Sequence, residues 1–116
     1  MPMKRMSFIA ALAVCTASQA SAGVSGFLLV NGTESAIADA SIRRAGTDGW
    51  TPLSASPSPG ASQAVKFADP DCAFDIRATV AGSGPVTWGR VNLCDVKSVT
   101  LKSDPVAGAW VDYDAP

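Results

Sequence analysis

The 116-residue chain contains no histidine. Histidine is the commonest general base near neutral pH and the commonest metal ligand, so its absence excludes Ser-His and Cys-His nucleophile systems. Cysteine is also scarce, with three residues. What remains for chemistry is carboxylates, lysines and hydroxyls. We therefore expect no catalytic residue, no metal site and no cofactor, and we interpret the protein as a non-enzyme.

Long apolar runs are absent outside the first residues, which resemble a secretory signal peptide. Lys4 and Arg5 form a positive start, and residues 7–14 form an apolar run too short to span a bilayer. An Ala-Ser-Ala stretch ending at Ala22 offers the small residues that signal peptidase requires. We expect removal of residues 1–22, or cleavage two residues earlier, and a periplasmic or secreted bacterial protein. In a competing interpretation, Cys15 is a lipidation site.

Positive charge is also in short supply once the signal peptide is gone. Loss of Lys4 and Arg5 moves the formal net charge from −1 to about −3. No basic stripe remains, which argues against nucleic acid as a partner, and no second apolar run indicates a membrane segment. The remaining length suits one small domain, which we divide into a β domain over residues 23–103 and a C-terminal tail or edge strand over 104–116.

Two cysteines, Cys72 and Cys94, remain after cleavage, and an even pair in an oxidising compartment predicts one disulfide. A closed loop of about 22 residues would stabilise the fold by roughly 3 kcal/mol on chain-entropy grounds. A redox-active pair normally has CxxC spacing near the start of a helix. We therefore interpret the pair as structural.

The remaining sequence has β-type patterning and almost no helical periodicity. In the clearest run, residues 72–80, apolar and polar side chains alternate with the period of a half-buried strand. Together the runs predict a small antiparallel β-sandwich or barrel-like sheet of six to seven strands, one hairpin of which is closed by the disulfide. The expected strands lie in residues 24–31, 37–44, 61–68, 72–81, 85–94 and 95–103, with a possible seventh in 109–113.

The expected hairpin has a loop over residues 82–84 (Gly-Ser-Gly), with Ala81 opposite Pro85. Continuing that register along the return strand would turn Val91 toward water. A β-bulge near Gly89 would restore the inward phase, because glycine accepts irregular backbone angles. We therefore predict a bulge at this position, and an irregularity is also expected in residues 37–44, where alternation is imperfect.

Acidic residues gather in two places, and each has a simple interpretation. Asp69 and Asp71 flank a proline between two strands, which favours a turn over a calcium or catalytic site. Asp104, Asp112 and Asp114 would form an acidic patch in one interpretation and a solvated tail in the other, which we prefer.

The charged residues expected on strands are interpreted as ion-pair partners. Asp75 and Arg77 fall on the outward face of the clearest strand, where a cross-strand charge pair is expected. Arg43 and Arg44 are adjacent, so they point to opposite faces, and we expect one of them to pair with an acid.

The three tryptophans are the best candidates for ligand contact, because an exposed indole can stack on a sugar or a peptide. Trp88 is expected in the core. Trp50 and Trp110 are weak ligand-binding candidates. The leading hypothesis is an exported, non-enzymatic β-domain that binds an unknown protein or glycan partner or supports the cell envelope. The alternatives are a carbohydrate-binding module and a carboxylate-dependent envelope enzyme.

The order of residues also resembles a group of small exported proteins of alphaproteobacteria without an assigned function. The resemblance covers residues 27–101 and rests on a pattern that includes FLLVN, SIRRAG, CAFDIR over residues 72–77, Trp88 and VNLC over residues 91–94. It implies no activity, cofactor or site residue.

Overall fold

The computed structural model describes residues 23–116, so the expected signal peptide and Cys15 lie outside the described part. Within it the fold is all-β, as predicted, but with eight strands where six to seven were expected. The strand not foreseen is β3, a two-residue element that lies outside all the expected strands. The strands are β1 (Phe27–Asn31), β2 (Ile37–Arg44), β3 (Thr51–Pro52), β4 (Ser62–Val65), β5 (Ala73–Val80), β6 (Gly84–Asn92), β7 (Ser98–Asp104) and β8 (Gly108–Asp114).

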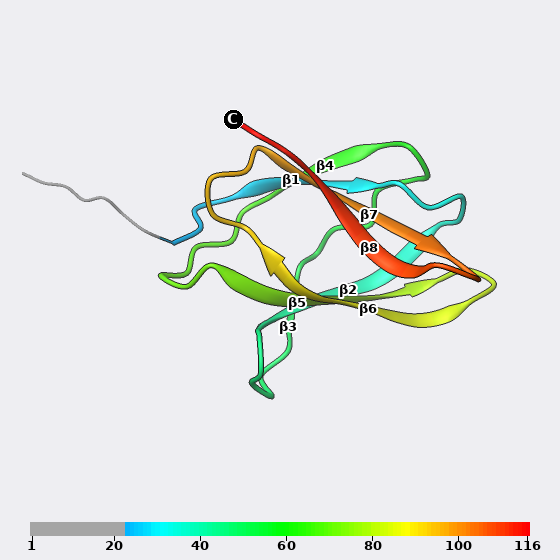
Figure 1. Ribbon diagram of the computed structural model, residues 1–116, viewed down its shortest axis with the longest axis horizontal. Coiled ribbons are helices and arrows are strands. Elements are labelled where there is room, and N and C mark those ends of the chain that lie inside the picture. Colours follow the sequence, from blue (N-terminus) through cyan, green and yellow to red (C-terminus); the bar gives the residue numbers. More distant parts are fainter. Residues whose placement is uncertain (1–22) are drawn as a thin grey trace, which may run out of the picture.

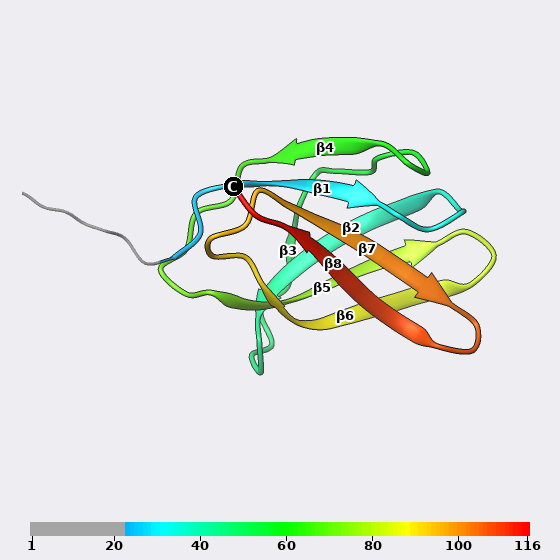
Figure 2. The same ribbon diagram turned by 45° about the horizontal axis from the view of Figure 1, so that its top comes forward.

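The strands form two four-stranded sheets, in the orders β4-β1-β7-β8 and β3-β2-β5-β6. Figure 1 shows the two sheets as layers, and Figure 2 separates their strands. Strands β1 and β7 pair in parallel at the centre of the first sheet, with Leu29 opposite Val99. The other strand pairs are antiparallel. The architecture is therefore a sandwich rather than a closed barrel.

The core lies between the two layers and is formed by the alternate residues of each strand. Phe74, Ile76 and Val91 from one sheet meet Leu29 and Leu101 from the other, all fully buried. Each sheet buries one face and exposes the other, so the side chains along a strand alternate between buried and exposed positions. For β5, and for Val91 of β6, this is the buried face that the sequence pattern predicts.

Trp88 of β6 is the largest fully buried side chain, as expected for the core, and it also joins the two sheets. Its Nε1–H donates a hydrogen bond to the backbone carbonyl of Lys102 on β7, at 2.8 Å. A buried indole N–H needs such a partner, because leaving it unpaired would cost its full desolvation energy.

The loop of the β5–β6 hairpin lies one residue earlier than expected. Val80 pairs with Gly84, so residues 81–83 form the loop, and Ala81 does not face Pro85. The Ser83 N–H bonds to the Val80 carbonyl at 2.9 Å and closes a tight turn before Gly84. Pro85 therefore lies opposite Thr79 and not Ala81, a shift of two residues along β5. Because side chains alternate with a period of two, this shift keeps each side chain on its predicted face.

The predicted bulge near Gly89 is confirmed. Ile76 pairs with Trp88, whereas Phe74 pairs with Val91, so one extra residue is inserted in β6. Arg90 absorbs the irregularity with φ of 53°. The phase change turns Val91 into the core, as anticipated. A second irregularity interrupts the β2–β5 pairing, also as expected, between Ala38 and Ser41.

The C-terminal residues form strand β8, which lies at the edge of its sheet and pairs with β7 along its whole length. Val111 of β8 packs against the core. The hydroxyl of Tyr113 accepts a hydrogen bond from the backbone N–H of Asn92, which ties β8 to β6 of the other sheet. Between residues 23 and 116, no helix is long and apolar enough to cross a membrane.

Candidate functional site

The predicted disulfide is present between Cys72 and Cys94, with Cα atoms 5.2 Å apart. It joins the residue before β5 to the residues that follow β6, at the end of the hairpin opposite its loop. Cys94 is buried at 9% exposure. The bridge therefore closes the hairpin, in agreement with a structural role.

Asp69 and Asp71 belong to a turn. The carboxylate of Asp69 accepts the backbone N–H of Asp71 at 2.8 Å and also pairs with Arg44. The hydrogen bond from the Asp71 N–H is the main cause that lowers the pKa of Asp69; burial opposes it, and the Arg44 guanidinium lowers the pKa further. No group of three or more potential metal ligands occurs in the described residues.

The acidic residues of the C-terminal hairpin do not converge. Asp104 lies at the turn of the β7–β8 hairpin, whereas Asp114 lies at the far end of β8, opposite Ser98. The Asp104 carboxylate accepts the N–H groups of Ala107 and Val106 at 3.0 and 2.7 Å. These bonds lower the pKa of Asp104. Its role is to close the turn.

Asp75 forms the cross-strand pair predicted for the outward face of β5. It lies opposite Arg43, whose Nε donates to its carboxylate at 2.9 Å, and it also accepts the backbone N–H of Arg90 at 3.0 Å. Burial alone would raise the pKa of Asp75, but the hydrogen bonds from Arg90 and Arg43 outweigh burial and lower it. Both arginines of the Arg43-Arg44 pair find an acid, where one was expected.

The Asp75 network predicts a pH-dependent contribution to stability. The Asp75→Asn variant is expected to lose about 1.5–3 kcal/mol of unfolding free energy at pH 7, because the hydrogen bonds from Arg43 Nε and the Arg90 backbone N–H lose their charged acceptor. The pKa of Asp75 is lower in the folded protein than in the unfolded chain, so the ionised carboxylate stabilises the fold at a pH above the ordinary aspartate pKa. This stabilisation is lost as the pH falls through the pKa of the folded protein. The deficit should therefore shrink below about pH 4.

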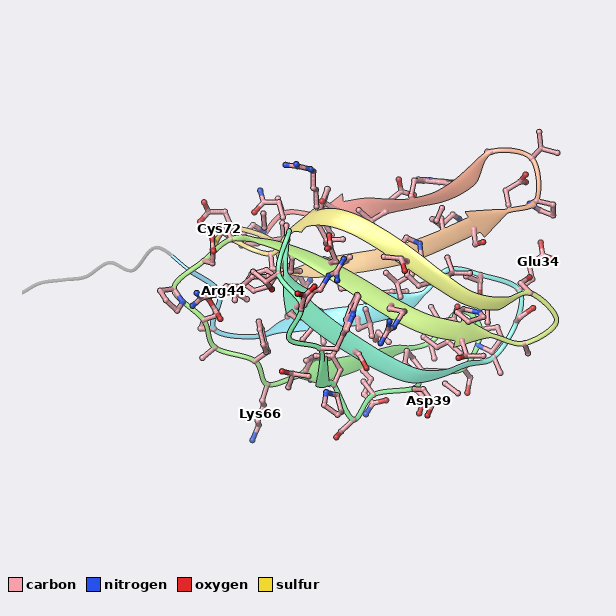
Figure 3. All side chains as sticks on the ribbon, turned by 90° about the horizontal axis from the view of Figure 1, so that it is seen from below. Glu34, Asp39, Arg44, Lys66 and Cys72 are labelled. Carbon is pink, nitrogen blue, oxygen red and sulfur yellow. A yellow bond between two sulfur atoms is a disulfide. The ribbon has the colours of Figure 1, made fainter. Side chains whose placement is uncertain are left out.

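Urea denaturation at pH 7 and pH 3 checks this expectation. Asp39→Asn is the matched control, because Asp39 is an exposed aspartate of the same sheet (Figure 3). That variant should be close to neutral at both pH values. An Asp75→Asn deficit of equal size at pH 3 and pH 7 would contradict the proposed role of the charge.

The two candidate tryptophans lie in different settings. Trp50 precedes β3 and is half-buried, with the guanidinium carbons of Arg43 and Arg77 at 4.4 and 4.0 Å from its ring. Trp110 of β8 is 40% exposed and belongs to the other sheet. The structure therefore does not bring them together. Trp110 retains free surface for a ligand, whereas arginines cover part of Trp50.

Trp110 lines an open hollow of about 600 Å³ at one end of the sandwich. The β1–β2 and β5–β6 loops and the β7–β8 hairpin meet at this end, on the right in Figures 1 and 2. Glu34 lies at the same end in Figure 3. The lining combines one aromatic ring with hydroxyl and charged groups, and comes from residues 32–35, Val80, Ser83, residues 102–105 and Trp110.

A buried hydrogen-bond network fixes the β1–β2 loop that forms one wall of this hollow. The fully buried Asn31 donates from Nδ2 to the carbonyls of Ser35 and Pro57, at 2.8 and 3.0 Å. Its Oδ1 accepts the backbone N–H of Thr33 at 2.9 Å and contacts the Thr33 hydroxyl at 2.6 Å. The Asn-Gly-Thr sequence indicates a turn, but no sequence pattern predicts the hydrogen bond from Asn31 to Pro57.

Gly32 explains how this wall can lie against β7. A Cβ at this position would lie 2.9 Å from the Leu101 carbonyl oxygen and 2.5 Å from the Thr100 methyl group. The Gly32 N–H bonds to that same carbonyl at 2.9 Å. Only glycine permits this close approach of two backbones.

Comparison with known proteins reveals a related fold. A protein from Eubacterium rectale, solved by NMR, is similar with a TM-score of 0.56 and 15% sequence identity, over 87% of this chain and 97% of that one. At this identity the likeness establishes a shared fold alone. No protein-family model matches the chain, and no curated protein matches it in sequence. The resemblance to small exported alphaproteobacterial proteins stays a prediction.

Proposed function

We propose that the protein is an exported, non-enzymatic β-domain that binds a saccharide of the cell envelope in the hollow beside Trp110. The observation that carries this proposal is an indole exposed by 40% at the wall of a polar hollow. Sugar rings combine an apolar face with a rim of hydroxyls. An aromatic platform flanked by hydrogen-bonding side chains is complementary to both.

The construction of the hollow supports this proposal over a flexible contact surface. The Asn31 network holds the β1–β2 loop in one conformation before any ligand arrives. The Asp104 bonds do the same for the β7–β8 turn. Because less ordering is then needed on binding, such a site gains affinity from few contacts.

The setting of Asp104 supports a binding role for this carboxylate rather than a role as general acid. Glu34 and Asp104 both line the hollow. A glycoside hydrolase needs one carboxyl group with a raised pKa as general acid. The pKa of Asp104 is instead lowered by the turn N–H groups that it accepts. An ionised, turn-bound carboxylate is better suited to accepting hydrogen bonds from sugar hydroxyls.

A titration with neutral envelope oligosaccharides tests the proposal. We expect the amide signals of residues 33–35 and the Trp110 indole N–H to shift in NMR spectra on addition of a bound sugar. The Trp110→Ala variant is expected to weaken binding about tenfold, since one aromatic contact contributes about 0.5–1.5 kcal/mol beyond the area it buries.

Val106→Ala is the matched control, because Val106 is 96% exposed on the same hairpin and does not line the hollow. Its affinity should equal that of the unchanged protein. Undiminished sugar binding by Trp110→Ala, or a protein partner bound through these residues in the absence of any sugar response, would refute the saccharide proposal.

A further inference from the structure

The outer face of the β3-β2-β5-β6 sheet carries a second group of side chains, remote from the hollow. We call it the arginine face and define it by Arg43, Trp50, Asp75, Arg77 and Arg90. The register places Arg43 opposite Asp75 on the neighbouring strand. Since Trp88 and Val91 both point inward, the bulge between them turns Arg90 outward. Figure 3 looks onto this sheet.

The charge of the arginine face is opposite to that of the domain. It holds three guanidinium groups and one carboxylate, in a chain whose part after residue 22 has a net charge of about −3. Asp75 neutralises Arg43. Within residues 23–116, neither Arg77 nor Arg90 forms an ion pair. Two of the three positive charges of the face therefore have no ion-pair partner among residues 23–116.

The guanidinium groups of Arg43 and Arg77 are held in place by Trp50. Arg43 and Arg77 both stack against Trp50, with guanidinium carbons 4.4 and 4.0 Å from the ring. Stacking occupies the flat side of a guanidinium and leaves its N–H groups, which lie in the plane, available as donors. Arg43 uses Nε for Asp75, so the terminal nitrogens remain. Two like charges on one ring repel each other, and a bound anion would relieve that repulsion.

We propose that the arginine face binds an acidic saccharide through its carboxylate or phosphate groups. Guanidinium forks match the paired oxygens of either group, and they do so best when they are ordered beforehand. Trp50 is the one apolar side chain that defines the face, and it is half-buried beneath Arg43 and Arg77. The exposed large hydrophobic residues of the described chain are Val106, Trp110 and Tyr113, which belong to the β7–β8 hairpin of the opposite sheet. A soluble polyanion therefore fits better than a lipid surface.

An NMR titration with two acidic probes and their neutral counterparts tests this proposal. The probes are a galacturonic acid tetramer, compared with its carboxyl-reduced form, and glucose 6-phosphate, compared with glucose. We expect at least one acidic probe to shift the Trp50 indole N–H and the Arg77 Nε–H signals, and the tighter probe identifies the preferred oxyanion. The Arg77→Gln/Arg90→Gln double variant should bind it at least about tenfold more weakly.

Lys66→Gln is the matched control, because Lys66 is an exposed cation away from this face (Figure 3). It should retain full affinity. Equal weakening by Lys66→Gln, equal shifts of the Trp50 indole N–H and Arg77 Nε–H signals with the neutral counterparts, or no shift of these signals with either acidic probe would overturn the proposal. Arginine-dependent binding to anionic lipid vesicles alone would overturn it in favour of a membrane. Trp110→Ala should leave the shifts of the Trp50 and Arg77 signals unchanged, so failure of the arginine face is distinct from failure of the saccharide site in the hollow.

Discussion

The Trp88→Ala variant is expected to lose about 3–5 kcal/mol of unfolding free energy, the largest effect of any single substitution considered. Trp88 is 2% exposed and is the largest fully buried side chain. Its removal leaves a cavity between the sheets and deprives the Lys102 carbonyl of the indole donor. For a domain of this size, that loss is a large share of a total stability of about 5–15 kcal/mol.

Chemical denaturation followed by far-ultraviolet circular dichroism measures this loss without relying on the substituted fluorophore. Trp88→Phe is the matched control, because it keeps most of the ring and removes the hydrogen bond to Lys102. It should lose less, with about 1–3 kcal/mol for the unpaired carbonyl. A Trp88→Ala deficit below about 1 kcal/mol would show that the sheets do not depend on this side chain.

Removal of the disulfide is the second large effect expected. The Cys72→Ser/Cys94→Ser variant should lose about 3 kcal/mol, since the bridge restricts the unfolded chain over a sequence separation of 22 residues. Serine replaces both sulfurs with small groups, so the native packing of β5 against β6 is retained.

The measurement compares unfolding of the oxidised protein, the reduced protein and the double variant. Reductant should bring the unchanged protein to the stability of the double variant and should leave the variant itself unaffected. If all three samples unfold at the same denaturant concentration, the bridge contributes nothing to stability and a redox role must be reconsidered.

Local patterning was sufficient to predict the β5–β6 hairpin. The strict alternation of residues 73–80 fixed the buried face of β5, and the conflict of phase around Val91 located the bulge. The exact loop was beyond this reasoning, because two glycines with positive φ, Gly82 and Gly84, both suit a turn. Only the bond from the Ser83 N–H to Val80 selects between them.

Pairings between strands far apart in the sequence could not be predicted. The short β3 exists because Thr51 and Pro52 meet β2, not because of their own propensity. The parallel contact of β1 with β7 likewise depends on how the whole chain folds, and apolar patterning carries no signal for it.

The candidate sites were predicted as residues but not as surfaces. Trp110 was a candidate from the sequence, yet the hollow beside it is built by three loops that only the fold brings together. Arg43 and Arg77 were interpreted as ordinary strand charges. Both arginines contact Trp50 because β3, which follows Trp50, pairs with β2. No sequence pattern predicts this pairing.

The parallel pairing of β1 with β7 has a consequence for the order of folding. The apolar β1 is the first strand of the described chain, whereas its neighbour β7 is the second-last. The β5–β6 hairpin can close locally in the meantime, but contacts between distant segments form late. Until β7 pairs with it, β1 keeps one unpaired hydrogen-bonding edge that other unfolded chains could join. Correct assembly therefore requires that β7 reaches this edge before a second chain does.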